Sequence, residues 1–157
     1  MREKIEHRIE MYNNVLQQCR DEFNKHNHHT SRSIELATEC EIWLYWLNII
    51  NHNISKKESF IGTDVYKMKN SFTYNSLDFK TDSLNKIECK VLFTKELFDE
   101  FLDNYLNFVI NRISEDINDC KLYSSTSKTS NLLEHLKFEH KKDILKFLKD
   151  IYDERKN

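Results

Sequence analysis

A chain of 157 residues with one Gly and no Pro has the size of one compact domain and could bury about two-thirds of its surface on folding. Its 24 basic and 26 acidic side chains nearly cancel, which argues against a protein that coats a polyanion. An apolar fraction of 39% is too high for a disordered chain, and the longest apolar stretch, 42–50, is too short for a membrane helix and contains Asn48. We therefore predict a single folded domain over 1–157, with no membrane segment and no direct binding of nucleic acid.

The composition also indicates the kind of genome that encodes the chain. Ala and Gly each occur once and Pro never, whereas Lys, Asn, Ile, Phe and Tyr are plentiful. Folding gives no reason for the scarcity of Ala, which is the best helix former. The favoured residues have AT-rich codons, so we expect an AT-rich genome. A low-GC bacterium, an AT-rich parasite, a phage, a large DNA virus or a mobile element such as a plasmid would fit.

The cysteines and the first residues predict a compartment. The start of the chain is charged and lacks the apolar core of a signal peptide. Cys19, Cys40, Cys89 and Cys120 are widely spaced without a C-x-x-C pair, which disfavours a zinc ribbon or a redox dithiol. All but Cys89 fall on apolar helical stripes. We expect these three to be reduced core thiols of a cytoplasmic protein that carries no cofactor.

Two amphipathic helices are predicted in the first third of the chain. Over 2–26, apolar residues recur at spacings of three and four, which places them on one face of a helix. Thr30 or Ser31 can cap the second helix, over 32–55. This helix is apolar over more than half of its circumference, so we expect it to be central or covered on two sides.

The pattern changes between residues 59 and 93. Segments 71–79 and 86–93 alternate between apolar and polar residues, and 60–65 is a weaker candidate of the same kind. We predict a small antiparallel unit of two or three strands. The alternative is an irregular loop that is packed by its aromatic side chains.

Two further helices are predicted after this segment. One spans 95–120 with Thr94 as its N-cap, and the other spans 131–154. Between them, 123–130 is rich in Ser and Thr, and we expect a mobile loop there. The predicted fold class is mainly α: a bundle of four amphipathic helices with a small antiparallel β insertion between the second and third.

One spacing suggests catalysis. Arg20 and His26 are six residues apart near the end of the first helix, with Asp21 beside the arginine. This pattern resembles the signature of the HEPN ribonucleases, which are all-helical proteins. The resemblance implies that Arg20 holds the scissile phosphate, that His26 acts as general base or acid, and that a helical dimer pairs two such sites. The alternative is a solvated helix end, where cationic side chains suit the helix dipole.

The sequence gives little support for a metal site or a phosphate-binding loop. His26, His28 and His29 are weak candidates for a transition-metal site, because imidazoles on a short segment are easily arranged around an ion. A metal site needs further ligands, and no carboxylate or thiol stands at a suitable spacing, so no metal is predicted. A chain with one Gly also cannot build a glycine-rich phosphate loop.

The aromatic residues of the second helix give the last candidate site. Trp43, Tyr45, Trp46 and Ile49 lie on a helix that is apolar on two sides, so they belong either to a deep core or to a surface that binds a partner.

Two functions follow from these patterns. The first is a non-enzymatic protein-binding module that inhibits, antagonises or neutralises a host or defence protein by covering its surface. The same surface could hold two copies of the chain together as a dimer. The second is a HEPN-like endoribonuclease that uses Arg20 and His26.

Overall fold

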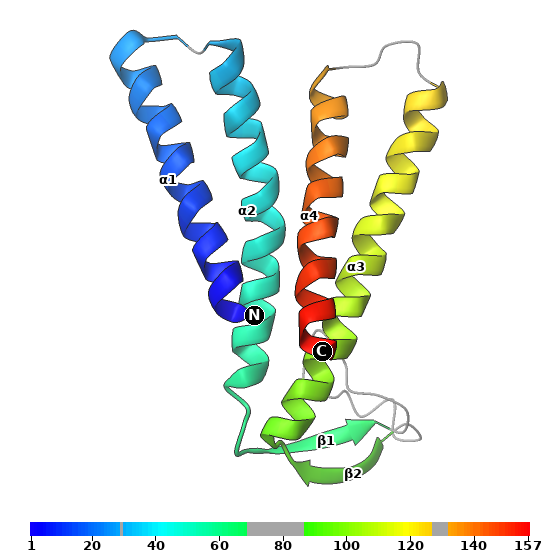
Figure 1. Cartoon of the computed structure of the whole chain (residues 1–157). Coiled ribbons are helices and arrows are strands. Elements are labelled where there is room, and N and C mark those ends of the chain that lie inside the picture. Colours follow the sequence, from blue (N-terminus) through cyan, green and yellow to red (C-terminus); the bar gives the residue numbers. More distant parts are fainter. Residues whose placement is uncertain (29, 69–86, 127–131) are drawn as a thin grey trace. The chain divides into compact units, whose positions relative to one another are not determined.

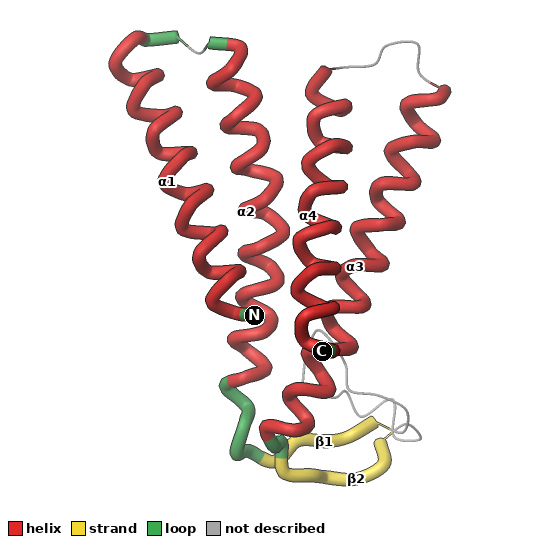
Figure 2. The backbone as a smooth tube through the Cα atoms, viewed as in Figure 1, coloured by secondary structure: helices red, strands yellow, loops and turns green. Residues whose placement is uncertain are grey.

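The computed structural model describes residues 1–28, 30–68, 87–126 and 132–157. Its elements in chain order are α1 (Arg2–His26), α2 (Ser31–Glu58), β1 (Asp64–Met68), β2 (Ile87–Leu92), α3 (Lys95–Thr126) and α4 (Leu132–Lys156) (Figures 1 and 2). The two strands form one antiparallel sheet between the second and third helices. The predicted fold class is therefore confirmed.

The chain divides into two compact units, which we describe separately. The larger unit consists of Met1–Asn51 and Val109–Asn157, and so contains α1, most of α2, the second half of α3 and α4. The smaller unit, His52–Phe108, contains the end of α2, both strands and the start of α3. A single domain over 1–157 stays a prediction.

The ends of the first two helices follow from local chemistry. α1 ends at His26 as predicted, because Asn27 adopts the left-handed conformation (φ 55°) and donates its N–H to the Phe23 carbonyl at 2.7 Å. The predicted cap of α2 is confirmed, since the Thr30 hydroxyl accepts the Ser33 N–H at 3.1 Å. α2 continues three residues past its predicted end at position 55.

The third helix begins as predicted and ends later. The Thr94 hydroxyl accepts the Leu97 N–H at 3.3 Å, which caps α3. α3 continues to Thr126, so the first part of the loop predicted over 123–130 is helical. Ser and Thr cost a helix only a few tenths of a kcal/mol each, which is too little to end an established helix. The rest of that loop lies outside the described residues.

The β unit is confirmed for one of the two stronger strand candidates. β2 matches the predicted segment 86–93, and its antiparallel partner β1 overlaps only the end of the weaker candidate 60–65. The beginning of that candidate forms a turn, in which Gly62 has φ 87°. The candidate 71–79 lies outside the described residues.

An aromatic row holds the smaller unit together. Phe101 of α3 stacks on Phe98 and Tyr105, with ring centroids 6.3 and 5.4 Å apart. The Tyr105 hydroxyl accepts a hydrogen bond of 2.8 Å from the Asn53 amide of α2, and the Lys57 ammonium lies 5.4 Å from the Phe101 ring centroid. Burial raises the pKa of Tyr105, and the Asn53 bond partly offsets this. These contacts join the end of α2 to the start of α3.

The core of the larger unit draws buried apolar side chains from all four helices. They are Ile5, Tyr12, Leu16 and Cys19 of α1, Cys40, Trp43, Leu44, Leu47 and Ile50 of α2, Val109, Ile110, Ile113 and Ile117 of α3, and Ile144, Leu148 and Ile151 of α4. Trp43 stacks on Tyr12 with centroids 5.1 Å apart and meets Phe147 edge-on at 5.6 Å. Trp43 therefore ties α2 to both α1 and α4.

Two of the three cysteines predicted for the core can be checked. Cys19 and Cys40 are buried thiols, as expected. Burial raises the pKa of Cys40 to about 11, and the nearby Cys19 and Glu39 add to the rise. The side chains of Cys89 and Cys120 lie outside the described part of the chain.

Candidate functional site

In the larger unit, α2 has an inner face and an outer face. Its buried residues point to one side. Helical geometry of 100° per residue places four other residues within an arc of about 60° on the opposite side. These four, which we call the α2 stripe, are Ile34, Thr38, Tyr45 and Ile49.

The α2 stripe exposes apolar surface along roughly 22 Å of helix. Tyr45 is 62% exposed, Ile34 45% and Ile49 40%. Single exposed apolar residues are common on protein surfaces, but the outer face of a bundle helix is normally polar. A row of them on that face makes it the candidate interaction surface of the larger unit.

A second aromatic ring supports the α2 stripe from the side. Trp46 is half-buried, and its ring meets the Tyr45 ring edge-on with centroids 5.5 Å apart. Edge-to-face is one of the two arrangements that aromatic pairs prefer. Tyr45 is therefore held in place although most of its side chain is in solvent.

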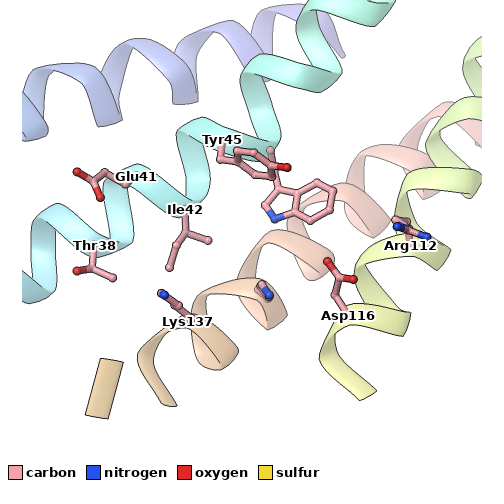
Figure 3. Close-up of a pocket in the computed structure, with 9 residues that line it drawn as sticks. Thr38, Glu41, Ile42, Tyr45, Arg112, Asp116 and Lys137 are labelled. Atoms are coloured by element: carbon pink, nitrogen blue, oxygen red, sulfur yellow. The ribbon is translucent and has the colours of Figure 1, made fainter. Parts of the chain in front are cut away.

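A hollow of about 480 Å³ opens beside the α2 stripe. Its lining residues come from three helices and are Thr38, Glu41, Ile42, Tyr45, Trp46, Arg112, Asp116, Lys137 and Lys141. Figure 3 shows Ile42 of α2 facing Lys137 of α4, with Asp116 of α3 directed into the same space. Three cationic and two anionic side chains leave the lining with one net positive charge.

The structure separates the four residues predicted to bind a partner. Tyr45, Trp46 and Ile49 lie together on or beside the α2 stripe. Trp43 is 3% exposed and belongs to the core of the larger unit. It offers no surface to a partner while that unit is folded. Its indole N–H also has no hydrogen-bond partner among the described residues, which is consistent with an apolar packing role.

Several residues of this surface were not predicted from the sequence. Ile34 has the right spacing from Tyr45 and Ile49, which was the available signal. Arg112, Lys137 and Lys141 line the hollow from other helices, and no local pattern connects them to α2.

Arg20 and His26 are both exposed on α1. Six residues of helix separate their Cα atoms by about 9 Å along the axis and turn them about 120° apart. They therefore lie on different faces of α1.

The two candidate metal ligands that the structure describes, His26 and His28, belong to no metal-binding cluster of described residues. The rings of His26 and His28 are 6.2 Å apart, and Nδ1 of His28 lies 2.8 Å from the His26 carbonyl oxygen. His29 lies outside the described residues. Across the described ranges, no three His, Cys, Asp or Glu side chains come close enough together to share a metal ion.

Within the part of the chain that the structure covers, none of the helices has the length and apolar character needed to cross a membrane. No protein-family model, no curated protein and no solved structure matches this chain. A function must therefore be argued from its own residues.

Proposed function

We propose that the chain is a non-enzymatic protein-binding module, and that the α2 stripe together with Trp46 is its binding surface. It acts by covering part of a host or defence protein, as an inhibitor, an antagonist or an immunity factor. The scarcity of Ala, Gly and Pro, whose codons are GC-rich, supports a phage, virus or mobile element with an AT-rich genome as its source.

The observation that supports this proposal is the exposed apolar row on the outer face of α2. Tyr45 is 62% exposed, although it is among the largest apolar side chains of the helix. Apolar surface left in water forgoes about 25 cal/mol of burial free energy per Å². A partner that covers the stripe would recover that free energy.

The residue types suit recognition by another protein. Tyr and Trp are enriched among the residues that dominate binding energy, because they bring large contact area with few rotatable bonds. The contact between Tyr45 and Trp46 orders both rings before binding. A preordered surface loses less side-chain entropy when a partner arrives.

The hollow beside the α2 stripe offers a partner both a concave surface and charged side chains. A partner side chain that enters it meets Ile42 and Trp46 on the α2 wall. Arg112, another lining residue, is an exposed cation whose ion pair with Glu115 is long, at 4.0 Å. Apolar contact at the centre with charged groups at the edge is the usual anatomy of a protein interface.

Photo-cross-linking can test the proposal directly. Tyr45 is replaced by the photoreactive amino acid p-benzoyl-phenylalanine in the full chain, which is expressed in its native host and irradiated. Met11 of α1, which is 37% exposed, is the matched control position. We expect a discrete covalent adduct with one protein from position 45 and none from position 11.

The adduct supports the proposal only if binding depends on the stripe. The captured protein is purified, and its affinity for the Ile49→Asp variant is compared with that for the unmodified chain. We expect the charged substitution to weaken binding by tenfold or more. Equal adducts from both positions, or no adduct from position 45 in a folded chain, would remove the basis of the proposal.

The ribonuclease hypothesis and the proposed function make opposite predictions about RNA hydrolysis. Under the ribonuclease hypothesis, the purified chain hydrolyses RNA, and the paired change Arg20→Ala and His26→Ala abolishes the activity. Under the proposed function, no RNA is hydrolysed above the level of that paired variant.

A further inference from the structure

The lysines of α4 have two kinds of environment. Four of them are exposed to solvent, as expected on the polar face of a bundle helix: Lys142, Lys146, Lys149 and Lys156. Lys137 and Lys141 are instead half-buried, and both line the hollow. They are one helical turn apart, where like charges repel each other. A phosphate between the two ammonium groups would relieve that repulsion, and their partial removal from water strengthens the attraction.

The α2 side of the hollow is apolar and aromatic. Ile42 and Trp46 are half-buried there, and Ile42 faces Lys137 across the hollow (Figure 3). Tyr45 meets the Trp46 ring edge-on beside them. Flat aromatic rings such as nucleobases stack on side chains of this type. The hollow therefore offers one ligand an aromatic wall and a cationic wall.

Two carboxylates complete the charged lining. Asp116 of α3 is directed into the hollow, and Glu41 belongs to its α2 side (Figure 3). They would repel a bare anion, but carboxylate oxygens accept hydrogen bonds from the N–H groups of a base. An acidic side chain of a protein would meet the lysines, yet it has no flat ring for Trp46 and no N–H for Asp116. The lining as a whole fits an aromatic ring with N–H groups that is joined to an anion.

We infer that the hollow of the larger unit binds a mononucleotide. The base packs against Ile42 and Trp46. The phosphate lies between Lys137 and Lys141. A volume of about 480 Å³ is within the range of pockets that hold small ligands. This site goes beyond the proposed function, because it takes a small molecule. A bound nucleotide would also fill the space that a partner side chain enters, and so would weaken partner binding at the α2 stripe.

Tryptophan fluorescence measures occupancy of the hollow directly. The chain has two Trp residues, and Trp43 is buried in the core, so a response to ligand is expected from Trp46. The probes are the four ribonucleoside monophosphates, with excitation at a wavelength that they do not absorb. We expect saturable quenching by at least one of them, with a Kd below about 1 mM. Calorimetric titration of the same pair checks the Kd independently.

Partial ligands separate the two halves of the site. The matching nucleoside has the ring without the phosphate and should bind at least tenfold more weakly. Inorganic phosphate has the anion without the ring and should bind more weakly by at least the same factor.

Charge variants locate the anion. Lys141→Glu should weaken nucleotide binding by tenfold or more, and Lys137→Glu, the second variant, should do the same. Lys146→Glu makes the same charge change at an exposed site of α4 that does not line the hollow, so it is the matched control and should leave the Kd unchanged. Circular dichroism and thermal unfolding establish that each variant is folded.

Three results would overturn the inference. The first is the absence of saturable binding by any of the four nucleotides. The second is a nucleotide that binds no more tightly than its nucleoside or inorganic phosphate. The third is an equal loss of affinity in Lys141→Glu and Lys146→Glu, which would indicate a general charge effect. The position-45 adduct with a host protein is measured without nucleotide, so failure of this site and failure of the proposed function are distinguishable.

Discussion

Two aromatic residues of α2, two positions apart, have opposite environments. Trp43 is 3% exposed and contacts Tyr12 and Phe147, whereas Tyr45 is 62% exposed and contacts Trp46. A separation of two residues turns a helix by about 200°, so the pair marks the inner and outer faces of α2. The inner face stabilises the larger unit, and the outer face is available for binding.

The difference shows that this helix is more apolar than its own bundle requires. The bundle covers the side that carries Trp43 and leaves Ile34, Tyr45 and Ile49 in solvent. Buried core residues and the exposed residues proposed to bind a partner are thus interleaved along one helix. Single substitutions can separate the two roles.

The largest expected effect is on folding. Trp43→Ala should lower the free energy of unfolding by about 3–5 kcal/mol, because it leaves a cavity between three helices. Tyr45→Ala, at a mostly exposed site, should change it by no more than about 0.5 kcal/mol. Urea denaturation of both variants provides the measurement. Equal losses would mean that the two faces do not differ in the way described.

The inner face should also make stability depend on pH. Burial holds the pKa of the Cys40 thiol at about 11, from an ordinary value of 9.0. Between these values the unfolded chain has released the proton that the folded chain retains, so stability falls as pH rises from about 9 to 11. Stability measured against pH should decline less steeply in Cys40→Ala. Because tyrosines also titrate in this range, the difference between the two slopes is the quantity to compare, and identical slopes would contradict the burial of Cys40.

A smaller effect is expected from the cation beside Trp43. The Arg8 guanidinium carbon lies 5.3 Å from the Trp43 ring centroid and 4.9 Å from that of Phe147. Arg8→Ala should cost about 1–2 kcal/mol of unfolding free energy. The control is Lys4→Ala, which removes an exposed ion pair with Glu154 and should cost about 0.5 kcal/mol or less. If the two variants lose the same amount, Arg8 contributes only as a surface charge.

The smallest effect is expected at Arg20 and His26. Both are exposed on α1, away from the α2 stripe in sequence and element. The paired change to Ala should alter the unfolding free energy by less than about 0.5 kcal/mol and leave partner affinity unchanged. Calorimetric titration with the captured protein measures the affinity. A loss of binding in this variant would extend the functional surface to α1.

Much of the fold was predictable because it depends on local chemistry. Thr30 and Thr94 accept the expected capping hydrogen bonds, and apolar spacing located all four helices. The end of α3 was predicted too early because the Ser and Thr residues after position 122 were interpreted as a loop. Helix continuation depends on the hydrogen-bond ladder already formed, which composition does not report.

The proposed binding surface was predictable only in part. The sequence identified Tyr45, Trp46 and Ile49, but it grouped Trp43 with them. Which side of α2 faces inward depends on Tyr12 and Phe147, which come from other helices. The basic lining of the hollow likewise comes from α3 and α4. Such tertiary contacts are not recorded in the periodicity of one segment.

The most direct test of the account is the affinity of the captured protein for the Tyr45→Asp variant, with the unfolding free energy measured on the same sample. The account predicts a loss of affinity of about thirtyfold, equivalent to about 2 kcal/mol, at unchanged stability. Unchanged affinity, or a loss that accompanies unfolding of the chain, would contradict it.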